Sequence, residues 1–522
     1  MPVMSDIKQS NKRIAKNSIF LTVRMMIVLL ISLYTTRLVL RALGVEDYGV
    51  YNVVCGFVSM FTFLNLSMSN GIQRFYNYEL GKNGEKGANK VYVTSLIIQA
   101  ILSLAVISLV ESLGLWYLHN KMVVPVNRLF AAEWIFQFSV ISFLFIILQA
   151  PFSAAVMAHE RMGFYSIISV LDVLLKLGIA LLIPFLSGDK LIWYGALMLL
   201  INVINFLLYS IYGKTHFSEI KFTRVFEKPL FRSMLGFSGW NLFGSFSGVM
   251  QEQGINLVLN FFFGPIVNAA RGVATQVNAG LEGFVTNITM PVRPQVVQSY
   301  ACGNDKRMMN LTFSVSKLSC CFLMMMAIPV SVEIHYILRI WLGDNVPDHA
   351  AAFTVIILFS SLISNLNAAT SNVVHATGDM KNYQFWGSII KICSVPIAFA
   401  VLRWYPRPEL ALLIVFVCRL TGHIVGLYIV RSLVGLSLKQ YVVKVVVPIL
   451  VVIAITFCVS LPIHFSLGEG FLRLVLVSFS GVVATGTSLF FLALDTNEKR
   501  LVFQLADGLI SKIKHRIHGN RQ

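Results

Sequence analysis

The residues of this chain that could do chemistry are charged groups placed inside long apolar stretches. Arg419 lies near the middle of one stretch, with His423 one helical turn later. Asp172 and Lys176 lie one turn apart near the middle of another, so that their charges can pair on one helix face. A charge at the centre of a bilayer costs about 2.5 to 3.5 kcal/mol on insertion scales unless it is paired or faces water. These residues therefore predict either structural ion pairs or a hydrated cavity for a charged ligand.

Two neighbouring stretches carry polar residues at helical spacing. Glu252, Asn256 and Asn260 recur at positions i, i+4 and i+8. The following stretch has a polar stripe that steps by three or four residues, namely Asn268, Arg271, Thr275, Asn278, Glu282, Thr286, Thr289 and Arg293. We interpret the two stretches as one hydrated wall, although amides in membrane helices also serve as packing contacts.

The charges assigned to the predicted cavity are mixed, with an excess of bases. This excess favours an anionic substrate over a cationic one. The alternative for several of these residues is structural: Asp172 with Lys176 as a neutral pair, and Lys391, Arg24 and Arg271 as residues whose side chains reach the headgroups. The bases are Arg24, Lys176, Lys391 and Arg419, and the acids, which are also candidate ion carriers, are Asp172, Glu252 and Glu282; Asn256, Asn260, Asn278 and His423 are assigned as polar cavity residues.

The elements that must position these residues are transmembrane helices. The 522 residues are 56% hydrophobic and 13% charged, against about 25% charged in ordinary soluble domains, and the mean hydropathy is +0.74. We find fourteen stretches of roughly 20 apolar residues. The sequence predicts an all-α, polytopic membrane protein with about 14 transmembrane helices. Its seven Cys show no CxxC or paired Cys/His spacing, so we expect neither a disulfide framework nor a metal site, and no cofactor.

An internal repeat predicts how the helices are grouped. Met68, Tyr78, Gly81 and Pro125 recur 222 residues later, between apolar stretches in the same order. Such duplication is typical of transporters, and an even number of spans between copies predicts two six-helix lobes related by an axis along the membrane normal. The expected divisions are a cytoplasmic head (1–16), an N-terminal lobe (17–213), a linker (214–233), a C-terminal lobe (234–432), two extra helices (433–494) and a basic tail (495–522).

The distribution of bases predicts the orientation. With the amino terminus inside, the cytoplasmic segments hold 26 of the 42 Lys and Arg. We therefore expect both termini in the cytoplasm, and a tail (497–516) that lies on the membrane surface as an amphipathic helix. Contact with anionic membrane lipids explains the net charge of +18 without a nucleic acid partner.

Four sequence runs resemble a known family. The runs RALGVEDYGVYNVV (Arg41–Val54), FSGWNLFG (Phe237–Gly244), FFGPIVNAARGVATQVN (Phe262–Asn278) and WLGDNVP (Trp341–Pro347) look like Wzx-type polysaccharide flippases, which belong to one superfamily with MATE multidrug exporters and lipid II flippases. The resemblance implies a V-shaped, two-lobed transporter in a bacterial inner membrane. It would move an undecaprenyl-diphosphate-linked oligosaccharide, such as an O-antigen, capsule or exopolysaccharide repeat unit, from the cytoplasmic to the periplasmic leaflet by alternating access. It also implies coupling to an H⁺ or Na⁺ gradient and contact with other polysaccharide-assembly membrane proteins, and transfers no binding residue.

Two other functions compete with this one. A MATE-like ion-coupled exporter would share the fold, but it would be expected to carry an unpaired carboxylate early in its first lobe, where the first span here has Arg24 and no acid. A membrane enzyme of polysaccharide assembly needs a sizeable outer loop, whereas the predicted outer loops are short. We therefore expect a flippase and not an enzyme.

Overall fold

The computed structural model is helical throughout the residues that it describes, without a strand among them. These are residues 2–494 and Lys499, apart from 160, 224–226, 290–295, 297–298, 301–302, 344, 378 and 495–498. For helical residues 2–24, 70, 162, 237–241, 287–289 and 493, only the backbone is described. The predicted amphipathic helix of the tail therefore lies outside the described residues, apart from Lys499.

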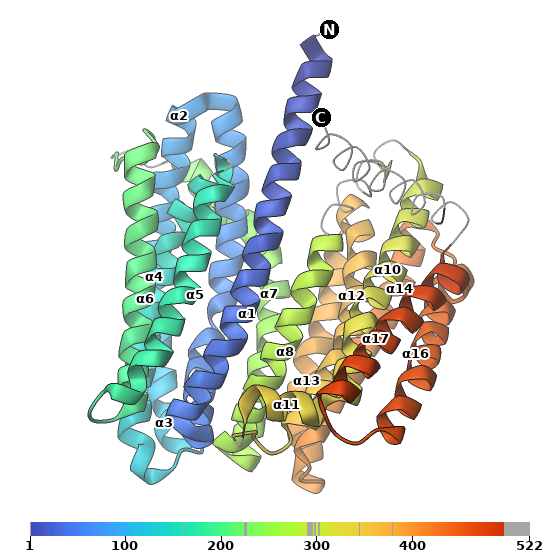
Figure 1. Ribbon diagram of the computed structural model, residues 1–522. Coiled ribbons are helices and arrows are strands. Elements are labelled where there is room, and N and C mark those ends of the chain that lie inside the picture. Colours follow the sequence, from blue (N-terminus) through green and yellow to red (C-terminus); the bar gives the residue numbers. More distant parts are fainter. Residues whose placement is uncertain are drawn as a thin grey trace, which may run out of the picture. The chain divides into compact units, whose positions relative to one another are not determined.

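The helices run in chain order as follows (Figure 1). The first set comprises α1 (Pro2–Ser59), α2 (Thr62–Leu109), α3 (Leu115–Asn120), α4 (Leu129–Ala158), α5 (Met162–Leu182), α6 (Lys190–His216), α7 (Lys228–Phe263) and α8 (Pro265–Thr289). The second comprises α10 (Asp305–Val332), α11 (Ile334–Leu342), α12 (Ala350–Thr377), α13 (Lys381–Trp404), α14 (Pro408–Val434), α15 (Leu438–Tyr441), α16 (Val447–Ser466) and α17 (Phe471–Ser488). Short π-helical turns at Val110–Gly114, Val442–Val446 and Leu489–Ala493 and 3₁₀ turns at Val126–Arg128 and Ile183–Phe185 continue or connect these helices.

Two of the helices contain a hairpin turn. Inside α1, Gly44 has φ 83°, and inside α2, Gly84 has φ 62°. Glycine adopts such positive φ angles without steric cost, and Figure 1 shows α2 reversing direction within its length. The first three predicted spans are thus distributed over α1, α2 and α3.

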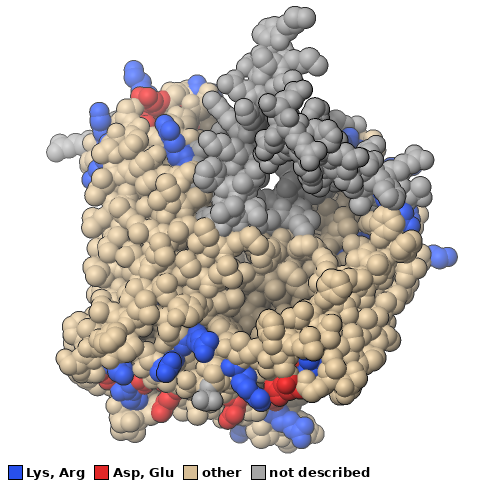
Figure 2. Space-filling view, viewed as in Figure 1, with Lys and Arg blue, Asp and Glu red and all other residues tan. Residues whose placement is uncertain are grey.

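The predicted count of membrane helices is confirmed. Eleven segments of the described residues are long and apolar enough to cross a membrane. The first three predicted spans fall within two of these segments, and α7 and α8 are missing from the eleven because their polar residues lower their hydropathy. With both adjustments the eleven segments match the fourteen predicted stretches. In Figure 2, the surface over α4, α5 and α6 has charged side chains at its two ends and an uncharged zone between them. The chain is a multi-pass membrane protein.

Close packing divides the chain into two compact units. Unit 1 comprises Met1–Gly283, Leu338–Ser360 and Lys381–Val425, and unit 2 comprises Phe284–Ile337, Ser361–Met380 and Gly426–Gln522. These units cut through several helices and do not follow the expected domain boundaries. The division into two six-helix lobes and two extra helices stays a prediction.

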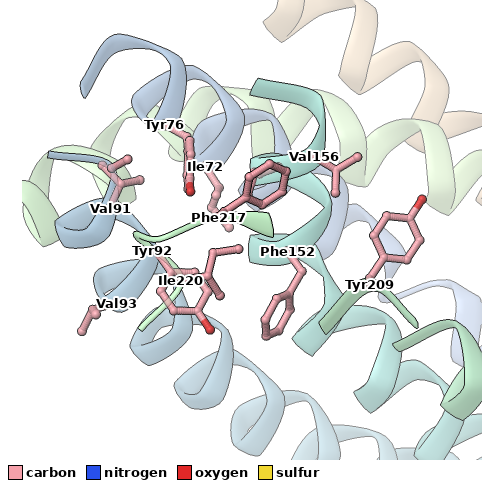
Figure 3. Close-up of a cluster of buried hydrophobic side chains, with 14 of the residues drawn as sticks. Ile72, Tyr76, Val91, Tyr92, Val93, Phe152, Val156, Tyr209, Phe217 and Ile220 are labelled. Carbon is pink, nitrogen blue, oxygen red and sulfur yellow. The ribbon is translucent and has the colours of Figure 1, made fainter. Parts of the chain in front are cut away.

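In unit 1, the helix bundle is closed at one end by the segment that follows α6. Phe217 and Ile220 are buried there among residues of α2 and α4 (Figure 3). Glu219 between them is also buried, and its carboxylate accepts hydrogen bonds from Tyr76 Oη at 2.7 Å and interacts with His159 Nε2 at 2.6 Å. Since burial of a lone carboxylate would be costly, this pair of partners is what allows the segment to pack inward.

The turns at the opposite ends of these helices are joined by Arg128. Its guanidinium donates to both carboxylate oxygens of Asp47, which follows the Gly44 turn, and to Asp189 Oδ2 at 2.8 Å. Asp189 is also the N-cap of α6 and accepts from Leu191 N at 2.9 Å. One arginine thus connects the α1 turn, the segment before α4 and the start of α6.

In unit 2, α16 and α17, which correspond to the last two predicted spans, pack on α10. The side chain of Glu333, which follows α10, has no exposed surface, and it pairs with Arg473 NH2 of α17 at 2.8 Å and His464 Nδ1 of α16 at 2.8 Å. Close contact between the helices depends on Gly481, because a Cβ there would lie 2.6 Å from Pro329 of α10.

Candidate functional site

The candidate site is a cluster of charges on four helices of unit 1. Helix α7 supplies Glu252, α8 Arg271 and Glu282, α13 Lys391, and α14 Arg419. The charge on Arg419 lies close enough to Glu252 and Glu282 to interact with both, and Lys391 interacts with Arg419 and Glu252. Three bases therefore meet two acids, which leaves the cluster with one positive charge in excess.

Close packing of α7 on α13 brings the cluster together. Ser247 Oγ lies 3.0 Å from Ser388 Oγ, and Gln251 Nε2 donates to Ser394 Oγ at 3.2 Å. At Gly254, a Cβ would lie 2.7 Å from Val395 Cγ2, so only glycine permits this approach. The polar residues of α7 are thereby turned toward α13 instead of toward lipid.

Arg419 is held by α7. Its Nε donates to Gln251 Oε1 at 3.4 Å, and its NH2 lies 4.0 Å from Glu252 Oε1. The Gln251 amide is oriented by its bond to Ser394, whose hydroxyl donates to the carbonyl of Lys391 at 2.6 Å. The Glu252 side chain is 63% exposed and that of Arg419 is 23% exposed. Arg419 is thus positioned by an amide while its acidic neighbour stays accessible to a ligand or ion.

Arg271, which the sequence analysis placed in the polar stripe but not among the cavity bases, belongs to this cluster as well because its charge interacts with Glu252 and Arg419. Its NH2 donates to the carbonyl of Glu252 at 2.6 Å. Its Nε is buried and has no hydrogen-bond partner among the described residues. A guanidinium with a spare donor beside a second one is suited to bind an oxyanion.

Two predicted cavity residues act instead as packing contacts. Asn260 donates to the carbonyl of Val123 at 3.1 Å and accepts from its N–H at 2.9 Å, and Asn256 accepts from Asn268 at 2.7 Å. Asn256 and Asn260 are also almost completely buried, at 4% and 0% exposure. They join α7 to α8 and to the turn before α4, so the predicted hydrated wall does not include them.

The remaining predicted residues have separate positions. Asn278 is half-buried on α8, and His423 is buried on α14 one turn from Arg419. The side chain of Arg24 lies outside the described residues. Among the residues that the structure describes, no three His, Cys, Asp or Glu side chains are grouped so as to hold a metal ion.

Asp172 and Lys176 form a pair of their own. Lys176 Nζ donates to Asp172 Oδ2 at 2.7 Å, and Asn205 of α6 donates to Asp172 Oδ1 at 2.8 Å. Helix α5, which carries the pair, packs on α1, α4 and α6. The structure therefore shows the predicted pairing and places it among the first six spans, beside the partner Asn205 that the sequence interpretation missed.

A polar cavity of about 330 Å³ lies beside this pair. Helix α2 lines it with Asn65, Ser69 and Gln73, and α4 and α6 contribute Gln149, Ser153, Asn202 and Asn205. None of the lining residues was singled out from the sequence. The available signal was the spacing of amides and hydroxyls at i, i+4 and i+8 on α2 and at i, i+4 on α4 within apolar helices.

Comparisons with known proteins relate this geometry to solved structures. No family model matches the sequence, and no curated protein matches it. Among solved structures, the lipid II flippase MurJ in an inward closed conformation has a TM-score of 0.70 at 13% identity, with 90% of this chain and 98% of that chain covered.

Two further solved structures are transporters. A multidrug resistance MATE family transporter of the MOP superfamily, in an inward-facing conformation, has a TM-score of 0.60 at 13% identity, with 80% of this chain and 98% of that chain covered. A MOP superfamily transporter from Pyrococcus furiosus has a TM-score of 0.59 at 14% identity, with 80% of this chain and 96% of that chain covered. At such low identities the likeness shows the fold alone: this chain has the fold of MOP superfamily transporters.

Proposed function

We propose that this protein is a flippase that moves a polyprenyl-diphosphate-linked oligosaccharide between membrane leaflets by alternating access. The observation that carries the proposal is the cluster of Arg271, Lys391 and Arg419 on three helices of a membrane protein. A diphosphate presents several anionic oxygens, and guanidinium groups bind such oxygens through two parallel hydrogen bonds. The single excess positive charge and the spare donor of Arg271 favour an anionic headgroup.

Each part of the substrate has a matching environment in this proposal. The polyprenyl tail stays in the bilayer, and the diphosphate pairs with the bases during the crossing, which offsets the cost of charge at mid-depth. Substrate transfer follows the direction that the sequence predicts, from the cytoplasmic to the periplasmic leaflet of a bacterial inner membrane. The comparison that supports a lipid-linked substrate is the fold shared with a lipid II flippase.

Ion coupling is part of the proposal. Glu252 is accessible and lies near Arg419, so that binding of H⁺ or Na⁺ at this carboxylate would change the charge that the substrate meets. Asp172 is a weaker candidate because Lys176 and Asn205 already occupy both of its oxygens.

A MATE-like exporter of small molecules is the second candidate, supported by the fold shared with MATE transporters. Purified protein in liposomes separates the two. We expect leaflet-resolved accessibility of a lipid-linked oligosaccharide to change in a protein-dependent way, while a cationic dye is not transported. Dye transport without translocation of any lipid-linked glycan would favour the exporter.

A further inference from the structure

The polar cavity among α2, α4 and α6 has no part in the diphosphate-binding cluster. Its lining carries no charged residue, whereas the cluster of Arg271, Lys391 and Arg419 lies on α8, α13 and α14. Asp172, which accepts a hydrogen bond from the lining residue Asn205, is neutralised by Lys176 at 2.7 Å. A diphosphate would find no base in this cavity, and a metal cation would find no free carboxylate on its walls.

The cavity walls offer both hydrogen-bond donors and hydrogen-bond acceptors. The amide of Gln149 has two N–H donors and an acceptor oxygen, and Ser153 can donate and accept. The amide of Asn202 donates to the carbonyl of Met198 at 3.1 Å and retains one further N–H and its acceptor oxygen. Asn205 is fixed by its bond to Asp172, and its own Oδ1 is buried without a hydrogen-bond partner among the described residues. Such an acceptor is costly unless a ligand or water satisfies it.

The cavity is large enough for one sugar ring. At about 30 Å³ for each water molecule, a volume of about 330 Å³ corresponds to about eleven waters. A sugar ring fits within this volume with space left for water, because its covalently bonded atoms pack more tightly than separate water molecules. Sugar hydroxyls donate and accept at once, which matches a neutral lining of amides and hydroxyls. The apolar part of the lining, which includes Ile146 and Met157, can contact the C–H face of a ring.

We propose that this cavity is a carbohydrate-binding site that holds one neutral sugar residue of the lipid-linked glycan. The assignment of the sugar to a lipid-linked glycan rests on the proposed function, but the site itself is separate from the basic cluster. Helix α2, which lines the cavity, also packs against α7, which carries Glu252. The two sites therefore lie on neighbouring helices of unit 1.

Direct binding can be measured without transport. In full-length Ser153→Cys protein in nanodiscs, alkylation of position 153 by N-ethylmaleimide is followed by mass spectrometry of the peptide that contains it. We expect free neutral di- and trisaccharides of hexoses, deoxyhexoses and N-acetylhexosamines to slow alkylation by about tenfold at saturation, and NaCl and inorganic pyrophosphate to have no effect. Slower alkylation in the presence of Na⁺ or of pyrophosphate would overturn the proposal. An alkylation rate that no sugar changes would also overturn it and would mean that the cavity holds water only.

Transport provides the second measurement. The substitutions Gln149→Met and Asn202→Leu keep the side-chain volume and remove the hydrogen bonds. We expect the double variant to move a polyprenyl diphosphate with one N-acetylglucosamine about tenfold more slowly and the sugar-free polyprenyl diphosphate at the original rate. The matched control is Gln137→Met on the same helix, whose amide bonds Glu111 outside the cavity. Equal slowing of both lipids, or of neither, would contradict a sugar site. If the original chain moves neither lipid, the proposed flippase function fails, and the alkylation measurement still decides whether the cavity binds sugar.

Discussion

Arg419 of α14 lies with its NH2 4.0 Å from Glu252 Oε1 of α7, and its Nε donates to the neighbouring Gln251 at 3.4 Å. The longer separation of the charged pair compared with a close ion pair, together with the 63% exposure of Glu252, means that the carboxylate can exchange Arg419 for another partner. An anionic substrate would compete for Arg419, and a coupling ion would compete for Glu252. This competition provides a physical link between substrate binding and ion binding.

Replacement of Glu252 by Gln should separate transport from its energy source. The amide keeps the size of the side chain but cannot take up a proton or hold Na⁺ by charge. We expect imposed H⁺ or Na⁺ gradients to lose their stimulation of transport, while equilibration of substrate between leaflets continues. The assay compares rates in proteoliposomes with and without a gradient. The control is Glu227→Gln, an exposed acid that pairs with Lys90; undiminished stimulation in Glu252→Gln would exclude Glu252 as the carrier.

Replacement of Glu219 by Gln should remove a pH dependence of stability. Burial raises the pKa of this carboxyl, but hydrogen bonds from His159 and Tyr76 outweigh burial and hold its pKa below the ordinary value. The stabilisation is therefore complete above the unfolded-state pKa of about 4.3 and is lost as the pH falls through the folded-state pKa.

The measurement is thermal unfolding of the detergent-solubilised protein between pH 7 and pH 3. We expect the melting temperature of the original chain to fall in the acid range. At pH 7 we expect Glu219→Gln to have a lower melting temperature, which corresponds to a loss of about 1 to 3 kcal/mol in the free energy of unfolding. Its melting temperature should then fall less as the pH is lowered. Parallel curves for the two proteins would show that Glu219 does not contribute in this way. Glu227→Gln serves again as the exposed control.

The membrane-spanning helices were predictable from the sequence because a helix needs about 20 consecutive apolar residues to cross the bilayer. The spacing of Asp172 and Lys176 likewise predicts their pair, since both lie on one helix. The cluster around Arg419 was only partly predictable: periodicity places Gln251 and Arg271 on helix faces, but which faces meet depends on packing at Gly254 and Val395. Asn65, Gln149 and Asn202 come from three helices, and their convergence on one cavity has no local signal.

Removal of Arg473 should weaken the attachment of α17 to α10. The Glu333 side chain is completely buried, so that Arg473→Ala leaves its charge with only His464 as a partner. Loss of one partner from a buried ion pair costs about 3 to 5 kcal/mol. We expect a clear decrease in melting temperature, measured against Lys439→Ala at an exposed position. A double variant Glu333→Gln/Arg473→Met should be less affected than Arg473→Ala alone, and equal stability of Arg473→Ala and the original chain would refute the role of this contact.

Gly49 should not tolerate a side chain. A Cβ at this position would lie 2.0 Å from the carbonyl oxygen of Pro265, so that even Ala forces α1 away from the start of α8. The contact joins two of the sequence runs that carry the family resemblance. We expect Gly49→Ala to lower the yield of folded protein, with Gly178→Ala, which meets no atom within 4 Å, as the control. Normal yield and melting temperature of Gly49→Ala would show that the helices can separate at no cost.

The central claim is that a basic cluster around Arg419 carries a lipid diphosphate across the membrane. Its most direct test is the rate at which purified protein in liposomes moves a polyprenyl-diphosphate-linked oligosaccharide between leaflets, compared for the original chain, Arg419→Ala and the exposed control Arg403→Ala at equal reconstitution. We predict protein-dependent movement for the original chain and the control, and a loss of at least about tenfold in Arg419→Ala. Unchanged movement in Arg419→Ala, with the protein folded, would contradict the account.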